Sequence, residues 1–372
     1  MTRVVFLIRS LGAGGAERQL TTLVRAMDKT HFEVTVITFY SGGYFEPALE
    51  ESNIRLIGLR KRGRWDVVPF LWRLIGELRR VHPDVIHSYL VEPNLASVLV
   101  KPLVRSPKIV WGVRASNMDV SNYDWFVRMN FRLQALASRF ADMIIFNSNA
   151  GRDHHLAYGF PPRRCTVIHG GVDTELFQPN RESGVPIRKE WGIRDDRILI
   201  GLVGRLHLAK DHPTFLKAAA RLARENPALR FVCVGSGPER YATILRRLTD
   251  EHEIADRVIW AGERGDMPAV YNALDIVCSS SATEGWPNAI GEAMACGVTC
   301  VVTGAGDSAA LVGETGIVVP PGDPHALAEG LKRGLKLVQS RQPPDTRARI
   351  AANFSLEQLV SRTEAALAAV QG

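Results

Sequence analysis

The sequence contains little cysteine and no long apolar run. None of its five cysteines forms a Cys-x-x-Cys pair; they are Cys165, Cys233, Cys278, Cys296 and Cys300. This spacing excludes the common structural zinc sites and fits a reduced, cytoplasmic compartment. Without 18 consecutive apolar residues, no segment is expected to span a membrane. Residues 4–8 already form an apolar stretch, so we also expect no removable leader peptide.

Asp-x-Asp triplets are absent as well. Hard cations such as Mg²⁺ and Mn²⁺ need oxygen ligands placed close together, which such a triplet would supply. We therefore expect no metal ion and no bound cofactor. Short internal repeats and low-complexity tracts are also missing, which excludes a repeat protein or a disordered chain.

The net charge of +7 is confined to the first half of the chain. Residues 1–180 contain 23 Lys and Arg against 16 Asp and Glu, whereas residues 181–372 contain 23 of each kind. A basic bias in one region favours an acidic partner for that region, either anionic lipid or nucleic acid. A merely soluble basic face is the alternative. Nucleic acid is disfavoured because no aromatic stacking platform accompanies the basic residues.

Strand-like and helix-like segments alternate along the chain, which predicts parallel sheets covered by helices. The expected strands of the first half are 4–8, 33–39, 85–88, 108–113, 141–148 and 166–169, with helices at about 16–27 and 67–80. Those of the second half are 198–203, 230–234, 258–260, 275–278, 299–303 and 316–319. Residues 178–189 are rich in Pro, Asn, Gly and charge, which indicates a linker. We therefore predict an α/β protein with two doubly wound domains, 1–180 and 181–355.

Two carboxylates, Glu284 and Glu292, lie near an expected helix start. Pro287 suits the first turn of a helix because its missing N–H would have no partner there, and Gly297 suits the helix end. Glu284 then lies at the carboxyl end of strand 275–278, where open α/β sheets bind ligands and helix N–H groups attract anions. Carboxylates accept hydrogen bonds from hydroxyls, so a ligand with hydroxyls and phosphate, such as a nucleotide sugar, is favoured.

Two cations, Arg205 and Lys210, follow the first strand of the second domain. Parallel strands place their carboxyl ends on one edge, so both cations should face the same site as Glu284. An Arg fork and a Lys point charge suit a diphosphate leaving group, whose charge grows as its bond breaks. A solvated surface position without function is the alternative for either residue.

The segment 11–18, with the sequence LGAGGAER, follows the first strand and opens a helix. It fails the dinucleotide-binding fingerprint, because Glu17 occupies the third glycine position and no acidic residue ends the second strand. A nicotinamide dehydrogenase is therefore disfavoured. Glycines that let a ligand approach the backbone fit better, with glycines that serve only a tight turn as the alternative.

Taken together, these segments resemble the retaining glycosyltransferases of family 4. That family has the GT-B architecture, in which two Rossmann-like domains face a central cleft. The resemblance covers nearly the whole chain, and the order and spacing of its motifs are specific. Besides the segments above, it includes the motifs DVIHS (84–88), RASNMD (114–119), IHGGVD (168–173), GRL (204–206) and VGSGP (234–238).

The resemblance implies how the second domain holds the donor. Arg205 and Lys210 would hold the donor diphosphate. Glu292 would accept hydrogen bonds from the ribose hydroxyls, and Glu284 would lie against the transferred sugar. Backbone N–H groups from Gly285 to Ile290, a stretch that includes Asn288, would complete the cradle. Arg264 marks the loop that would line the nucleobase.

The first domain would supply the rest of the site. Gly15 would bring its backbone close to the donor phosphate, and His87 would lie near the reaction centre. Where many relatives have a second histidine, this chain has Tyr89, so a paired-histidine role is not expected. A satisfied core histidine is the alternative for His87. A final helix, residues 356–372, would return to the first domain.

The loop 60–65 is a candidate membrane contact. It carries four cations and a tryptophan, namely Arg60, Lys61, Arg62, Arg64 and Trp65. Each cation near an anionic lipid surface contributes about 1 kcal/mol. We hypothesise peripheral attachment at the inner face of the cytoplasmic membrane, where a lipid-linked acceptor would be met. The helix that follows is expected to be mostly core.

The prediction is thus a retaining glycosyltransferase that needs no metal ion. It would move a sugar from a UDP- or GDP-linked donor to a glycan or polyprenyl-linked acceptor in surface polysaccharide or lipopolysaccharide biosynthesis. The leaving phosphate oxygen would help to deprotonate the acceptor hydroxyl, with a catalytic set of His87, Arg205, Lys210 and Glu284. A GT-B nucleotide-sugar epimerase and a binding protein without catalysis are the alternatives.

Overall fold

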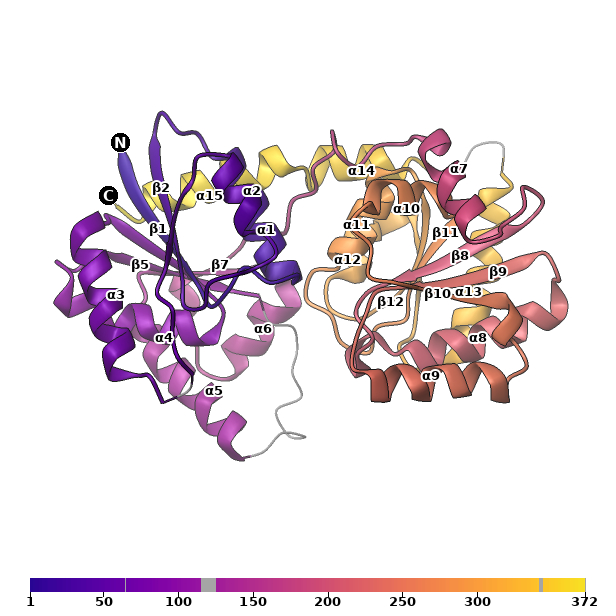
Figure 1. The fold of residues 1–372 in the computed structure, drawn as a ribbon, viewed down its shortest axis with the longest axis horizontal. Helices are drawn as coiled ribbons and strands as arrows, with labels where there is room; N and C mark the ends of the chain where they lie inside the picture. Colours follow the sequence, from indigo (N-terminus) through magenta and orange to yellow (C-terminus); the bar gives the residue numbers. More distant parts are fainter. Residues whose placement is uncertain (64, 115–124, 341–343, 372) are drawn as a thin grey trace. The chain divides into compact units, whose positions relative to one another are not determined.

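The computed structural model describes residues 1–63, 65–114, 125–340 and 344–371, and it divides into two compact units (Figure 1). The first unit comprises residues 1–171 together with 356–372, and the second comprises residues 172–355. In each unit a parallel sheet lies between helices that cover both of its faces. This is the α/β architecture that the alternating segments predict.

In the first unit, the described residues form a seven-stranded sheet in the order β3-β2-β1-β4-β5-β6-β7. Its strands are β1 (Thr2–Ile8), β2 (Phe32–Thr38), β3 (Arg55–Gly58), β4 (Val85–Tyr89), β5 (Lys108–Val113), β6 (Met143–Phe146) and β7 (Cys165–Val167). The chain builds outward from β1 to β3 and then restarts at β4 on the other side of β1. The gap between β1 and β4 is therefore a topological switch point.

Helices cover both faces of this sheet (Figure 1). Helices α3, α4 and α5 pack on one face, where Phe70, Leu74 and Ala96 join a buried core with Leu7 and Ile86. On the other face, α1 and α2 pack together with α15, the last helix of the chain. The helices are α1 (Gly15–Ala26), α2 (Glu46–Glu51), α3 (Val68–Val81), α4 (Val91–Val100), α5 (Trp125–Ala137), α6 (Asn149–Ala157) and α15 (Leu356–Ala369).

The second unit contains a six-stranded sheet within its described residues, in the order β10-β9-β8-β11-β12-β13. Its strands are β8 (Ile198–Val203), β9 (Leu229–Val234), β10 (Val258–Gly262), β11 (Ile276–Ser279), β12 (Thr299–Thr303) and β13 (Ile317–Val319). The switch point here lies between β8 and β11, which pair directly through Cys278 and Leu202. Ligands bind at such points in open α/β sheets.

Two helical layers enclose the second sheet (Figure 1). Helices α8, α9 and α13 pack on one face, and α10, α11, α12 and α14 pack on the other. The helices are α7 (Arg181–Glu190), α8 (His212–Glu225), α9 (Glu239–Glu251), α10 (Met267–Ala273), α11 (Asn288–Ala295), α12 (Ser308–Val312), α13 (Pro324–Val338) and α14 (Thr346–Asn353). Side-chain caps start several of them; Asp211, for example, accepts a hydrogen bond from the Thr214 N–H at the start of α8.

The linker predicted at residues 178–189 is wrong, because most of this stretch is helix α7. Asn180 caps the helix by accepting a hydrogen bond from the Ser183 N–H at 3.2 Å. Gly184 lets α7 approach α10 closely, since a Cβ at this position would lie 2.4 Å from the Asn272 carbonyl oxygen. The glycine that indicated a linker therefore serves helix packing.

The boundary between the units also differs from the expected one after residue 180. Val172 is buried in the core of the second unit, and its N–H donates to the Phe354 carbonyl at 2.9 Å. Residues 172–180 thus belong to the second unit. The short edge strand β3 was not predicted, because its residues are only partly buried or exposed and its apolar pattern is weak.

Candidate functional site

Three charged residues predicted for the site lie at the switch point of the second unit. Arg205 and Lys210 lie in the loop that joins β8 to α8, and Glu284 lies in the loop that joins β11 to α11. Because β8 and β11 are parallel neighbours, both loops leave the sheet at the same edge. The sequence predicted this shared edge, and the structure brings two of the three side chains into contact.

That contact is an ion pair between Lys210 and Glu284. The Lys210 ammonium lies 2.5 Å from one carboxylate oxygen of Glu284, and the same oxygen accepts a hydrogen bond from the Ser281 hydroxyl at 3.0 Å. The side chains are 25% and 14% exposed, respectively. The pair is therefore partly shielded from water but open to a ligand, which could take one of the three ammonium donors.

The two loops that carry this pair are bonded to each other. The Ser280 hydroxyl donates to the carbonyls of Lys210 and Asp211, at 2.8 and 2.9 Å. The Ala282 N–H donates to the Ala209 carbonyl at 2.9 Å. These bonds hold the backbone beneath the ion pair in place, so the pair occupies a pre-formed position.

A third loop, between β12 and α12, packs against the backbone of Glu284. Gly306 lies there in the left-handed region, with a φ of 56°. A Cβ at Gly306 would lie 2.0 Å from the Glu284 carbonyl oxygen, so only glycine permits this approach. The Asp307 N–H adds a hydrogen bond to the Gly285 carbonyl at 3.1 Å.

Arg205 differs from Lys210 in having no internal partner among the described residues. Its side chain is exposed, and no carboxylate or carbonyl of the described chain pairs with its guanidinium. An Arg fork offers five N–H donors in a planar array that matches phosphate oxygens. Arg205 is thus a cation available to an anionic ligand, in the same loop as Lys210.

Glu292 lies deeper than Glu284. It belongs to α11 and is only 4% exposed. One of its carboxylate oxygens accepts a hydrogen bond from the Tyr271 hydroxyl of α10 at 2.8 Å. This bond orients the carboxylate, which lies beyond the first turn of the helix. Its expected contact with ribose stays a prediction.

The backbone cradle expected from Gly285 to Ile290 is already partly used. The Asn288 N–H donates to the Trp286 carbonyl at 3.1 Å, and the Ile290 N–H donates to the Pro287 carbonyl at 3.0 Å. Pro287 itself is the N-cap of α11, one position earlier than expected. A role of this stretch in holding phosphate stays a prediction.

Arg264 is held by two acidic side chains. Its guanidinium contacts Glu190 of α7 at 2.6 Å and Asp266 at 2.7 Å. The hydrogen bonds to Asp266 and Glu190 raise the pKa of Arg264 above its usual value. These bonds occupy four of its five N–H donors, so Arg264 ties α7 to the loop before α10. A nucleobase contact by this side chain stays a prediction.

The two predicted residues of the first unit lie at its own switch point. Gly15 is the first residue of α1, which the loop 9–14 joins to β1. His87 lies in the neighbouring strand β4, which pairs with β1 through the partners Phe6 and His87. Gly15 therefore lies beyond the carboxyl end of β1, where the fold favours a ligand, whereas His87 lies in the middle of β4.

His87 itself is completely buried. Its ring lies between Phe6 and Tyr89, at centroid distances of 5.2 and 4.8 Å. Neither ring nitrogen has a hydrogen-bond partner among the described residues. Burial, with a smaller contribution from the Arg114 charge, lowers the pKa of His87 well below its ordinary value. The imidazole is thus neutral, and its expected place beside the reaction centre stays a prediction.

The basic loop of the first unit is largely exposed. Trp65 is 84% exposed, and Arg60 and Arg62 are exposed as well. The Lys61 ammonium lies 5.8 Å from the ring centres of both Tyr40 and Phe70, so it is held against the body of the unit. Arg64 lies outside the described residues. Over the part of the chain that is described, no helix is both long and apolar enough to cross a membrane.

Sequence reasoning missed the residues that position the two glutamates. Tyr271, Ser281 and Gly306 hold Glu292 and Glu284, yet each comes from a different loop or helix. Ser281 is three residues before Glu284 in the same loop, whereas Tyr271 and Gly306 are distant in the sequence and make their contacts only in the folded unit. The glycine at 306 carried the only signal, as a possible close approach.

Comparisons with known proteins agree with this arrangement. The family model "Glycosyltransferase Family 4" matches residues 13–176, and the model "Glycosyl transferases group 1" matches residues 197–336. The two matches fall one in each unit. Together they span most of the chain, including the loops that carry Arg205, Lys210 and Glu284.

Two curated relatives show the range of similar proteins. A D-inositol 3-phosphate glycosyltransferase of Kribbella flavida is 31% identical over 64% of this chain and 59% of its own length. The UDP-Gal:alpha-D-GlcNAc-diphosphoundecaprenol alpha-1,3-galactosyltransferase of Escherichia coli is 26% identical over 61% of this chain and 59% of its own. The chain thus spans less than two thirds of either relative.

A solved structure matches over nearly the whole length. The Anabaena protein HepE, in complex with UDP-glucose, superimposes with a TM-score of 0.87 at 23% identity. The match covers 99% of this chain and 100% of HepE. At this identity the match establishes the fold alone.

Proposed function

Because the chain belongs to family 4 of the glycosyltransferases and has the GT-B fold, we propose that it uses a UDP- or GDP-linked sugar as donor. The sugar would pass to a glycan or lipid-linked acceptor, with retention of anomeric configuration, in surface polysaccharide or lipopolysaccharide biosynthesis. The E. coli relative, whose name gives UDP-Gal as donor and a diphosphoundecaprenol acceptor, supports this choice of substrates. The HepE complex with UDP-glucose supports a uridine donor.

The observation that carries the proposal is the Lys210–Glu284 pair at the switch point, with Arg205 beside it. The oxygens of a donor diphosphate bound here would accept hydrogen bonds from the Arg205 guanidinium and from one or more N–H groups of the Lys210 ammonium. Both cations would then face the oxygen on which charge grows as the sugar leaves. Such charge stabilisation acts mainly in the transition state and therefore raises turnover.

Glu284 would exchange partners when the donor binds. In the structure its carboxylate is satisfied by Lys210 and Ser281. As the ammonium turns toward the diphosphate, the carboxylate becomes an acceptor for sugar hydroxyls. Glu292, oriented by Tyr271, would accept from the ribose hydroxyls. Glu284 would thus bind the sugar part of the donor, and Glu292 would bind its nucleoside part.

Metal independence is part of the proposal. The sequence has no Asp-x-Asp triplet, and the cations Arg205 and Lys210 can neutralise a diphosphate directly. The retaining step we propose is a front-side attack. A leaving phosphate oxygen accepts the proton of the acceptor hydroxyl while that hydroxyl bonds to the anomeric carbon, so no protein nucleophile is needed. Gly15 and neutral His87 would contribute from the first unit.

We also propose peripheral attachment to an anionic membrane surface. Arg60, Lys61, Arg62 and Trp65 are the described residues that support it, and Arg64 adds a further charge in the sequence. A cytoplasmic position at the inner face of the membrane would give access to a lipid-linked acceptor. The basic excess of residues 1–180 fits such a surface.

A donor panel tests the proposed function. UDP-, GDP- and ADP-sugars are incubated with crude acceptor lipids, with and without EDTA, and nucleotide release is measured. We expect release that depends on acceptor, survives EDTA and is lost in Lys210→Ala. A changed sugar without release would instead indicate an epimerase, and binding without either reaction would indicate a non-catalytic protein.

A further inference from the structure

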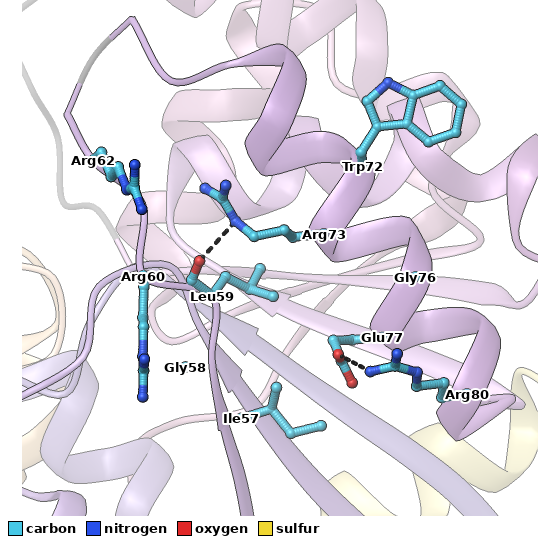
Figure 2. Close-up of a pocket in the computed structure, with 10 residues that line it drawn as sticks. All are labelled: Ile57, Gly58, Leu59, Arg60, Arg62, Trp72, Arg73, Gly76, Glu77 and Arg80. Atoms are coloured by element: carbon cyan, nitrogen blue, oxygen red, sulfur yellow. Dashed lines mark hydrogen bonds and ion pairs between the residues drawn. The ribbon is translucent and has the colours of Figure 1, made fainter.

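The first unit contains a basic hollow that the proposed transfer reaction does not use. It has a volume of about 530 Å³ and lies between the edge strand β3 and helix α3 (Figure 2). Its lining includes four arginines and one carboxylate; these are Arg60, Arg62, Arg73, Arg80 and Glu77.

Two of these arginines are held by carboxylates. Arg73 donates to Asp66 at 2.5 Å and to the Leu59 carbonyl at 3.0 Å, and Arg80 donates to Glu77 at 2.6 Å. Figure 2 shows the Arg73 guanidinium over Leu59 and the Glu77–Arg80 pair at the other end of the hollow. Their positions are thus fixed, and Arg73 keeps unused N–H donors.

The other two arginines have no such partner. Among the described residues, Arg60 and Arg62 form no ion pair, and both side chains are exposed. Their loop is nevertheless anchored, because the Arg62 N–H donates to Asp66 at 2.8 Å. This hydrogen bond lowers the pKa of Asp66, and the hydrogen bond from Arg73 lowers it by a smaller amount, so the carboxylate stays charged. The hollow therefore holds an excess of positive charge that its own residues do not neutralise.

Exposed tryptophans lie next to this charge. Trp72 lines the hollow and is 66% exposed, and Trp65 in the neighbouring loop is 84% exposed. Val68, one turn before Trp72 on α3, is 63% exposed. Large apolar side chains beside unpaired arginines fit the boundary between lipid headgroups and acyl chains, where tryptophan is enriched.

We propose that this hollow binds the phosphate of an anionic lipid headgroup. Arg60, Arg62 and the unused donors of Arg73 would hold the phosphate, while Trp65 and Trp72 would enter the interface beside it. The proposal deepens the membrane attachment suggested above and rests on it. It replaces a diffuse attraction between a basic loop and a surface by a defined site for one headgroup.

Gly76 offers a test that leaves every charge in place. It lines the hollow from the middle of α3, and a Cβ added there would meet no atom within 4 Å. The larger side chain of leucine at this position would therefore extend into the hollow, whereas alanine would leave most of it open. Both changes also favour the helix, because glycine is a poor helix former.

The experiment measures how the full-length protein sediments with vesicles of phosphatidylcholine alone or with about one third phosphatidylglycerol. We expect wild type and Gly76→Ala to bind the anionic vesicles, and Gly76→Leu to lose at least about fivefold in affinity. Arg60→Gln should lose a similar amount, and Arg55→Gln, at the far end of β3, should lose less than twofold. Equal binding by Gly76→Leu and Gly76→Ala would overturn the proposal.

Two further arms separate the sources of phosphate and the two proposals. Glycerol 3-phosphate should displace wild type from anionic vesicles better than chloride at the same ionic strength; tight binding of the free phosphate without any vesicle binding would refute a lipid site. UDP affinity, titrated in parallel, should be the same in all variants. Absent UDP binding in the wild type would contradict the proposed function and leave the vesicle result standing.

Discussion

The two units share one topology but differ in what lies at their switch points. In the second unit, Lys210, Glu284 and Arg205 gather beside the first and fourth strands of the series, β8 and β11. In the first unit, the corresponding pair β1 and β4 carries a glycine turn, the buried and neutral His87, and an exposed ion pair between Arg9 and Glu92. Four arginines of the first unit instead line a hollow at the sheet edge, between β3 and α3.

This difference shows how one fold can serve two tasks. The topology fixes where a ligand can approach, whereas the loop residues decide which ligand is favoured. A charged switch point suits the diphosphate part of a donor. The switch point of the first unit, where Arg9 and Glu92 neutralise each other, suits the uncharged hydroxyls of a sugar or acceptor, and the basic edge suits an anionic surface. The predictions below concern substitutions in one unit or the other and test this difference between them.

The largest expected effect is at the charged switch point. Lys210→Ala should lower kcat about 100- to 1,000-fold in the acceptor-dependent assay, because the leaving diphosphate loses a positioned cation. Arg205→Ala should act in the same direction. Lys217→Ala, an exposed lysine on α8, is the matched control and should retain activity. Steady-state kinetics check this, and a change confined to the donor KM would contradict a role in the transition state.

Glycine substitutions should have opposite effects in the two units. Gly306→Ala places a Cβ 2.0 Å from the Glu284 carbonyl in a left-handed backbone, so we expect a loss of about 1–3 kcal/mol of unfolding free energy. Gly76→Ala should instead gain up to about 1 kcal/mol, because it lies in open space within a helix. Urea unfolding measures both. A fully stable Gly306→Ala would show that the β12 loop does not constrain Glu284.

Buried histidines should make the fold sensitive to acid. Burial lowers the pKa of His155 in the first unit and of His212 in the second to about 4. Below their ordinary pKa of about 6.5, the unfolded chain binds protons that the folded chain does not. Stability should therefore be full above pH 6.5 and fall as the pH drops toward 4. Each histidine should cost roughly 2 kcal/mol at pH 5.

Urea unfolding at pH 7.5, 6 and 5 measures this loss. His155→Gln should reduce the slope of stability against pH relative to wild type, and His325→Gln, an exposed histidine on α13, should leave it unchanged. A stability that does not change between pH 7.5 and 5 would contradict neutral burial.

The smallest effect is expected at Tyr271. Removal of its hydroxyl in Tyr271→Phe leaves Glu292 without one hydrogen bond, which is worth about 1 kcal/mol. We expect the affinity for UDP to fall about three- to fivefold, measured by calorimetric titration. The preference for one UDP-linked sugar over another, which we attribute to Glu284, should not change. Tyr241→Phe, on α9 and outside this contact, is the control. Unchanged affinity would separate Glu292 from nucleotide binding.

The fold class and the charged site could be predicted because they depend on local patterns. Strand and helix periodicity gave the two parallel sheets, and the position of each loop after a strand placed Arg205, Lys210 and Glu284 on one edge. Parallel topology carries this information, since every strand ends on the same side.

The remaining features depend on contacts between distant segments. Helix α7 was mistaken for a linker because Gly184 and Pro186 look like breakers in isolation, whereas packing on α10 requires the glycine. The burial of Glu292 and its bond to Tyr271 could not be read from spacing, because they arise when α10 packs on α11. The sequence also does not indicate that both ring nitrogens of His87 lack a hydrogen-bond partner among the described residues, because this depends on the side chains that enclose β4.

The most direct test of the division between the units compares UDP with UMP in calorimetric titrations of the full-length protein with EDTA present. We predict that Lys210→Ala loses about tenfold in affinity for UDP but not for UMP, and that the double variant Arg60→Ala/Arg62→Ala binds both as wild type does. Equal losses for UDP and UMP in Lys210→Ala, or a loss of UDP binding in the double variant, would contradict a diphosphate site in the second unit.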